Sequence, residues 1–145
     1  MATLHKILIK DIMVTKLITV GLDTPFSQVW EIFSGQRIRH LPVINQDKKL
    51  KGLVTQRDFY RIVPPRKDVE DNGSFYLKED LDKFILQKVM IDKVATLFPQ
   101  DTLGMAINLM VQKKYGCIPI VDEKGVLVGI LTQTDALKAI ANYFL

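Results

Sequence analysis

The string GLVTQRD (52–58) recurs as GILTQTD (129–135), 77 positions further along a chain of 145 residues. The same shift aligns residues 13–62 with residues 90–139 without a gap, and apolar positions match even where the residue types differ. An internal repeat of this kind indicates one supersecondary unit that is used twice. Two copies of so small a unit are expected to pack against each other, because neither buries enough apolar surface alone.

Each copy is predicted to fold as β-α-β-β-α, so the fold class is α/β (α+β), with tandem repeats packed as a pseudo-two-fold pair. Apolar residues recur at helical spacing in the first helix of each copy, and Pro25 suits the first turn of the earlier one. Asp23 or Thr24 is expected to cap that helix, and Asp101 to cap its counterpart. Polar turns join the two strands that follow, as in hairpins. Strands are expected at 17–20, 40–44 and 50–55 and at 94–97, 117–121 and 127–132, with final helices from Gln56 and Gln133.

The repeat predicts three parts along the chain. Residues 1–63 are expected to form the first repeat, which a lead-in helix over 5–13 introduces. Residues 64–80 are polar and turn-rich, which is typical of a linker loop. Residues 81–145 are expected to form the second repeat, and a helix over 81–90 leads into it.

The composition is that of an ordinary globular domain, with 48% hydrophobic and 25% charged residues. No apolar run approaches the roughly 20 residues that a membrane helix needs, and the N-terminus lacks a credible signal peptide, so a cytoplasmic location is expected. The single cysteine, Cys117, agrees with a reducing compartment and is expected to be a small buried residue. The net charge of +4 suits anionic partners, but no dense basic block predicts nucleic-acid binding.

The T-x-x-D element that ends each string, from Thr55 to Asp58 and from Thr132 to Asp135, has two interpretations. As a helix cap, the hydroxyl accepts a hydrogen bond from a helix amide, and the acid lies near the positive helix end. As a ligand site, the carboxylate accepts two hydrogen bonds from the vicinal hydroxyls of a ribose. The helix N-terminus and Arg57 then offer positive potential to a phosphate. Taken alone, the element is more typical of a cap.

The repeat, the strings RHLPVI (39–44) and GCIPIV (116–121) and the two T-x-x-D endings together resemble a CBS domain pair, the cystathionine beta-synthase type of module also called a Bateman module. The resemblance extends from about Ile9 to Tyr143. The long inter-repeat loop and the lack of an attached catalytic domain are similar to stand-alone CBS proteins of the acetoin-utilisation type. With the resemblance, ribose binding becomes the favoured interpretation of T-x-x-D.

The family pattern implies two related clefts between the repeats, each with a ribose end, a base-binding wall and a phosphate end. The residues implied at the first site are Asp58 and Thr55 for the ribose, the backbone of Ile18, Thr19 and Val20 for the adenine edge, Leu41 and Pro42 for its face, and Arg39, His40 and Arg57 for phosphates. Those implied at the second are Asp135 and Thr132 for the ribose and Ala95, Thr96, Ile118 and Pro119 around the base. Gly116, Cys117 and Thr134 replace the basic residues there, with Lys113 and Lys114 as partial compensation. We therefore predict unequal sites, the first being the better phosphate binder.

These expectations describe a regulatory module, an energy or metabolite sensor for AMP, ADP or ATP, with S-adenosylmethionine or NAD as further candidates. The resemblance also implies a homodimer formed through the helical faces. No phosphate-binding glycine loop, zinc-ligand spacing or nucleophile elbow occurs, so neither an enzyme nor a metal or cofactor site is expected. The alternative is a ligand-free structural or protein-interaction module whose T-x-x-D elements serve only as caps.

Overall fold

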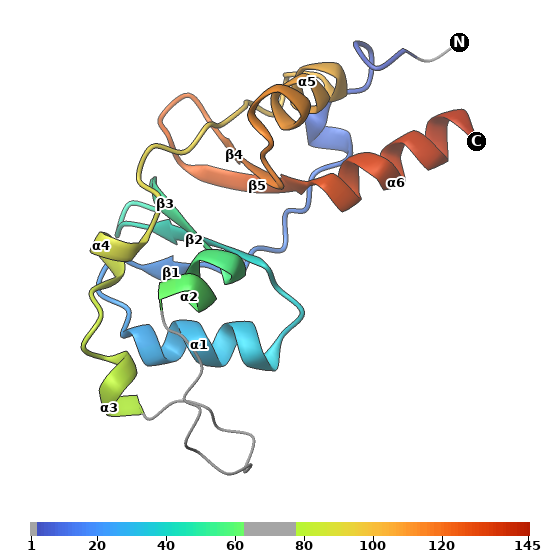
Figure 1. The fold of residues 1–145 in the computed structure, drawn as a ribbon. Coiled ribbons are helices and arrows are strands. Elements are labelled where there is room, and N and C mark those ends of the chain that lie inside the picture. The colour runs from blue at the N-terminus through green and yellow to red at the C-terminus, as the bar shows by residue number, and fades with distance from the viewer. Residues whose placement is uncertain (1–2, 63–77) are drawn as a thin grey trace. The chain divides into compact units, whose positions relative to one another are not determined.

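The computed structural model describes residues 3–62 and 78–145. They form two compact units that are interleaved along the sequence, as the colours of Figure 1 show. The first-repeat unit comprises 19–46, 51–62 and 78–93, and the second-repeat unit comprises 3–18, 47–50 and 94–145. Each unit has its own hydrophobic core. The division predicted above thus follows the two sequence repeats and not the compact units.

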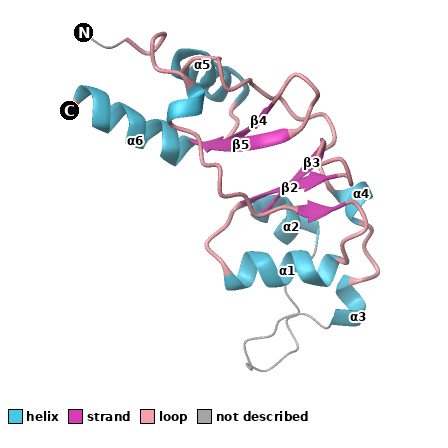
Figure 2. Ribbon diagram, turned by 180° about the vertical axis from the view of Figure 1, so that it is seen from behind, coloured by secondary structure: helices cyan, strands magenta, loops and turns pink. Residues whose placement is uncertain are grey.

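The first-repeat unit is built on a three-stranded sheet. The strand order is β1 (Val20–Gly21), β2 (His40–Ile44), β3 (Leu50–Thr55), and β1 runs parallel to β2 with Val20 opposite Val43. Helices α1 (Phe26–Gly35) and α2 (Gln56–Ile62) lie on one side of this sheet in Figures 1 and 2. Two shorter helices, α3 (Lys78–Leu81) and α4 (Leu86–Val89), add Leu81 and Leu86 to the same core. The predicted hairpin of 40–44 and 50–55 is confirmed.

The second-repeat unit reproduces this plan. Its helices are α5 (Leu103–Lys113) and α6 (Gln133–Phe144), and strands β4 (Cys117–Val121) and β5 (Leu127–Thr132) form an antiparallel hairpin with Cys117 opposite Thr132. Leu97 forms a parallel bridge to Ile120. These two residues are the counterparts, 77 positions later, of Val20 and Val43. The β-α-β-β-α repeat is therefore confirmed at the level of strand register.

The chain before each repeat packs on the hairpin of the other repeat. Val14 pairs with Ile130 of β5, and Ile91 pairs with Leu53 of β3. The amide and carbonyl groups of each pair exchange hydrogen bonds of 2.9–3.0 Å. Because both pairs obey the same shift of 77, the exchange is reciprocal, and this explains why the compact units are interleaved.

The predicted lead-in helices are wrong. Residues 5–13 contain only one 3-10 turn, η1 (Ile9–Asp11). The carbonyl oxygens of Leu4 and Ile7 instead accept hydrogen bonds from the first amides of α5, at 2.9 and 2.8 Å. A continuous α-helix would use these carbonyls within itself, so the contact with α5 prevents one. The helix expected over 81–90 is likewise broken, because Ile85 has an extended backbone between α3 and α4.

Two further local predictions need correction. Thr24 and Asp101 do not cap α1 and α5: the Thr24 hydroxyl accepts from the Gly21 amide, and the Asp101 carboxylate accepts from the Phe98 amide. Asp23 does not cap α1 either, because Pro25 is the N-cap residue and makes no side-chain cap bond, whereas Thr102 caps α5. The strands expected at 17–20 and 94–97 shorten to β1 and to the bridge at Leu97. Most of the predicted linker loop lies outside the described residues, and its end, from Lys78, begins α3.

The glycines of the recurring strings lie where the exchanged segments approach the hairpins closely. A Cβ at Gly52 would lie 2.5 Å from the Met90 sulfur and 3.0 Å from the Ile91 carbonyl oxygen, whereas the three atoms nearest to a Cβ at Gly129 all belong to the Met13 side chain. A methionine side chain can move, but the Ile91 backbone is held by its pairing with β3.

We therefore expect Gly52→Ala to lower the free energy of unfolding by about 1–3 kcal/mol, as overpacking does, and Gly129→Ala to lower it by less. Urea denaturation of the two variants measures this difference. Equal losses would show that the backbone contact at Gly52 is unimportant.

Candidate functional site

Both T-x-x-D threonines stand at a strand end and cap the helix that follows. The Thr55 hydroxyl accepts a hydrogen bond from the Asp58 amide at 3.0 Å, and the Thr132 hydroxyl accepts one from the Asp135 amide at 3.2 Å. Each bond satisfies an amide that has no partner within its own helix. The capping hypothesis is thus confirmed for both threonines.

The two aspartates differ in what their carboxylates do. One oxygen of Asp135 accepts hydrogen bonds from the amide and the hydroxyl of Thr132, both at 2.9 Å, and closes a capping box. The half-buried carboxylate of Asp58 accepts no hydrogen bond from any residue in the described parts of the chain. A carboxylate has about four acceptor sites. Asp58 therefore presents its full acceptor capacity to a ligand, and Asp135 presents one oxygen.

The other first-site candidates lie around the start of β2. The Gln56 amide donates to the Arg39 carbonyl at 2.8 Å, so α2 begins beside Arg39. Thr19 precedes the Val20–Val43 pair and therefore lies near Pro42. Ile18 directly precedes Thr19 and is the last residue of the N-terminal segment of the second-repeat unit.

The side chains of Leu41 and Ile118 lie in the two hydrophobic cores. Both residues are 0% exposed. In this structure neither side chain offers a ligand the apolar contact that the resemblance implied. The strand alternation that places Leu41 and Val43 toward the core explains the difference.

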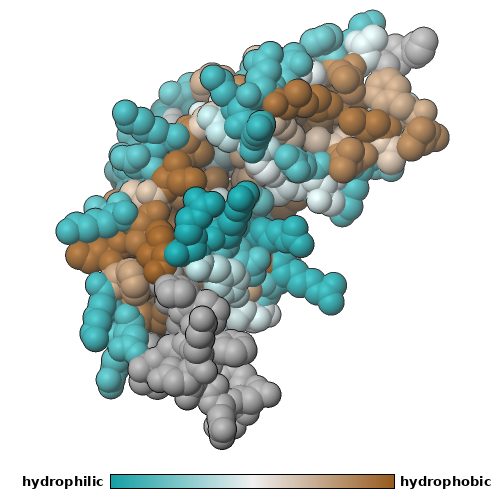
Figure 3. Space-filling model, viewed as in Figure 1, coloured by the Kyte–Doolittle hydropathy of each residue, from teal (hydrophilic) through white to brown (hydrophobic). Residues whose placement is uncertain are grey.

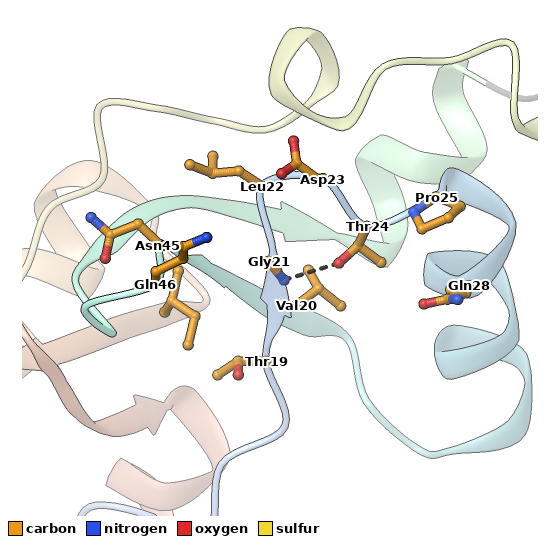
Figure 4. Close-up of a pocket in the computed structure, with 11 residues that line it drawn as sticks. Thr19, Val20, Gly21, Leu22, Asp23, Thr24, Pro25, Gln28, Asn45 and Gln46 are labelled. Carbon is orange, nitrogen blue, oxygen red and sulfur yellow. Dashed lines mark hydrogen bonds between the residues drawn. The ribbon is translucent and has the colours of Figure 1, made fainter.

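Two cavities that described residues of the first-repeat unit line divide the candidates. One, of about 620 Å³, is lined by residues 19–25, Gln28 and 44–46, including Thr19 and Val20 (Figure 4). Asp23 is the one charged residue among those that line it. The other, of about 510 Å³, is lined by residues 33–39 and Gln56, and its charged residues are Arg37 and Arg39. The adenine-edge candidates and Arg39 thus line different cavities.

The second-site candidates gather at one end of the β4–β5 hairpin. Thr132 lies opposite Cys117, next to Ile118. The Leu97 amide donates to the Pro119 carbonyl at 3.3 Å, which places Thr96 beside this strand, with half-buried Ala95 before it. Lys113 ends α5, and exposed Lys114 follows it with a left-handed backbone, at a φ of 58°.

His40 is not a charged group in this setting. Burial, and secondarily the neighbouring Arg39 guanidinium, lowers the pKa of His40 below its usual 6.5. The imidazole is therefore neutral at pH 7, and only Arg39 and Arg57 remain as cations among the predicted phosphate contacts of the first site.

This shift predicts a pH dependence of stability. The pKa of His40 is lower in the folded chain than in the unfolded chain. As the pH falls below about 6.5, the unfolded chain therefore binds more protons than the folded chain, and the free energy of unfolding decreases. We expect His40→Gln to reduce the decline in unfolding free energy between about pH 6.5 and 5. Urea titrations across that range measure the slope. An unchanged slope would mean that His40 does not titrate differently in the two states.

Cys117 is buried, as expected. Burial, with a smaller contribution from the Asp135 carboxylate, raises the pKa of its thiol to about 12. The thiolate is the nucleophilic form of cysteine, so Cys117 supplies no reactive group to the second site. Within the described residues, no three side chains of the types that bind metal ions cluster together.

Comparisons with known proteins agree with this fold. A family model described as the CBS domain matches residues 9–64 and 86–142. Since these matches cover most of the sequence, the chain belongs to the CBS domain family, and its two repeats form a CBS pair. None of the helices in the described parts has the length and apolar character needed to span a bilayer.

Solved CBS structures share the architecture. CBSX2 of Arabidopsis thaliana, solved with AMP, has a TM-score of 0.77 at 23% identity over 94% of this chain and 97% of its own. A CBS pair solved with 5′-methylthioadenosine and S-adenosyl-L-methionine has a TM-score of 0.74 at 21% identity, over 93% and 96%. An acetoin utilization protein (AcuB) from Vibrio cholerae has a TM-score of 0.73 at 27% identity, over 94% and 91%. The predicted resemblance to CBS pairs, including the acetoin-utilisation type, is confirmed.

Proposed function

We propose that the chain is a regulatory module that binds adenosine-containing metabolites, with AMP, ADP and ATP as the first candidates. The observation that carries this proposal is the carboxylate of Asp58, which is half-buried at the start of α2 and has no hydrogen-bond partner among the described residues. Because no described residue occupies its acceptor sites, this carboxylate can accept hydrogen bonds from a ligand. The vicinal hydroxyls of a ribose provide two donors in the required arrangement.

In this proposal, the other first-site candidates contact the rest of the ligand. Arg39 and Arg57 supply positive charge for a phosphate, and the backbone near Thr19 supplies hydrogen-bonding groups for a base. Asp135 has only one free oxygen, and its neighbours at the phosphate end are uncharged apart from Lys113 and Lys114. The first site is therefore the stronger of the two. That CBS pairs of the same fold have been solved with AMP or with S-adenosyl-L-methionine supports this ligand class.

A panel of thermal unfolding measurements tests the proposal. AMP, ADP, ATP, NAD and S-adenosylmethionine are each added at rising concentration. A ligand present at about 100 times its dissociation constant adds about 2.7 kcal/mol to the stability of the folded state. We expect at least one adenosine compound to stabilise the protein. Inosine and guanosine analogues serve as controls. No stabilisation by any of the five compounds would refute the proposal.

A second candidate function is a ligand-free structural or protein-interaction module. The capping box of Asp135 favours it, because that carboxylate already has a structural role. In that case every T-x-x-D element acts only on its own helix, and no adenosine compound changes the stability. The nucleotide panel therefore separates the two functions.

The helices of the second-repeat unit support a homodimer. Val111 of α5 and Leu137 of α6 are 71% and 66% exposed, and Phe144 is also exposed. Apolar side chains gather over these two helices in Figure 3. Exposed apolar patches of this kind are typical of protein interfaces, and a second copy of the chain is the proposed partner. The cytoplasmic location stays a prediction from the sequence.

A further inference from the structure

The cavity at the end of α1 has the features of an anion pocket. It measures about 510 Å³ and is lined by residues 33–39 and by Gln56. This volume lies within the range of small-molecule sites, about 300–1,000 Å³. Apart from buried Phe33, half-buried Ile38 and Gly35, the residues that line it are polar.

Two arginines and no acidic residue line the pocket. Arg37 and Arg39 are both exposed, and no residue that lines the pocket is acidic. Within the described residues, neither guanidinium forms an ion pair or a hydrogen bond. Guanidinium groups bind phosphate oxygens through two parallel hydrogen bonds, which makes arginine the usual residue for this recognition.

A structural role for these arginines accounts for only part of the charge. The pocket adjoins the C-terminal end of α1, where unpaired carbonyls carry roughly half a negative charge. Two guanidinium groups exceed that charge several-fold. The pocket therefore remains strongly positive after the helix end has been compensated.

The second repeat has a basic residue and a glutamine at the positions that correspond to Arg37 and Gln56. The shift of 77 places Arg37 on Lys114 and Gln56 on Gln133. The side-chain amide of Gln133 donates to the Tyr115 carbonyl at 3.1 Å. The side-chain amide of Gln56 has no partner among the described residues, so it is free to donate to a ligand. At this position the side-chain amide is therefore available to a ligand in the first repeat and occupied in the second.

We propose that the pocket of Arg37, Arg39 and Gln56 binds the phosphate chain of the ligand, and that Arg37 is a further ligand-binding residue that favours nucleoside di- and triphosphates over monophosphates. The assignment to nucleotides rests on the proposed function. The affinity for a phosphate chain rests only on the pocket.

Isothermal titration calorimetry at low ionic strength, with AMP, ATP and inorganic tripolyphosphate, tests this inference. The wild-type protein is expected to bind ATP more tightly than AMP, and to bind tripolyphosphate. Arg37→Gln is expected to weaken the binding of ATP and of tripolyphosphate by about tenfold or more, which is the effect of one lost hydrogen bond to a charged group. The preference for ATP over AMP then falls. Lys51→Gln is the matched control, because it removes one exposed positive charge from the same unit outside the pocket.

The outcomes separate this inference from the proposed function. If tripolyphosphate binds and Arg37→Gln weakens it, but no adenylate binds better than tripolyphosphate, the pocket is supported and the adenosine proposal fails. If adenylates bind but Arg37→Gln changes ATP no more than Lys51→Gln does, the pocket inference is overturned and the proposed function stands. Absence of tripolyphosphate binding to the wild-type protein also overturns the pocket inference.

Discussion

Phe59→Ala is expected to lower the free energy of unfolding by about 3–5 kcal/mol, the usual loss for a phenylalanine removed from a well-packed core. Phe59 is 0% exposed. Its ring stacks on Phe26 at a centroid distance of 4.8 Å and meets the edge of Phe33 at 5.8 Å. The substitution removes the residue through which α2 is fixed to α1 and the sheet. Urea denaturation followed by circular dichroism measures the loss.

Phe98→Ala is the matched control for that prediction. Phe98 precedes α5 and is 48% exposed, so truncation there should change the stability by only about 0.5 kcal/mol. A small loss for Phe59→Ala, close to that of the control, would contradict the core described for the first-repeat unit.

Asp58→Ala is expected to remove the stabilisation that an adenosine ligand gives through the first site. At about 100 times the dissociation constant, this amounts to about 2.7 kcal/mol. Without ligand, the variant should lose only about 0.3–1 kcal/mol, the contribution of one acid near a helix N-terminus. The two effects differ in size, so thermal unfolding with and without the best ligand of the panel distinguishes a binding residue from a cap.

Two further variants complete that experiment. Asp135→Ala should lower the stability without ligand by about 0.5–2 kcal/mol, because it breaks a capping box, while most of the ligand response remains. Asp92→Ala removes an exposed acid from the same unit as Asp58 and should leave the response unchanged. A full ligand response in Asp58→Ala would assign the T-x-x-D element of the first repeat to capping alone.

The elements that the sequence predicts well are those that local patterns determine. The apolar stripes of α1 and α5 and the strand–turn–strand segments of each hairpin depend on residues close together in the chain, and the shift of 77 supports each prediction twice. The same shift relates the parallel pair of Val20 and Val43 to that of Leu97 and Ile120, although the sequence alone did not predict either pair.

The elements that it predicts poorly are those that distant contacts determine. Residues 5–13 have helical spacing, but the Leu4 and Ile7 carbonyls bond to the start of α5. Thr24 and Asp101 are suitable capping residues, but they stabilise turns instead. Nothing in the local sequence shows that each lead-in segment packs on the hairpin of the other repeat, although the paired glycines Gly52 and Gly129 mark where it happens.

The candidate site shows the same division. The T-x-x-D spacing predicted both caps, but it did not reveal that the carboxylates of Asp58 and Asp135 differ in their hydrogen bonds. Burial, which the string RHLPVI does not reveal, removes the Leu41 side chain and the charge of His40 from the ligand contacts. Arg37 was not among the sequence candidates, although its alignment with Lys114 was the signal that would have found it.

Binding of AMP compared with 2′,3′-dideoxy-AMP, measured by isothermal titration calorimetry on the wild-type protein, tests the ribose contact of Asp58 most directly. The two nucleotides have the same base and phosphate. They differ only in the two ribose hydroxyls that are proposed to donate hydrogen bonds to the Asp58 carboxylate. AMP is expected to bind at least about tenfold more tightly, because hydrogen bonds to a charged group are lost in the analogue. Equal affinities would contradict the account, as would the absence of binding by every adenosine compound of the panel.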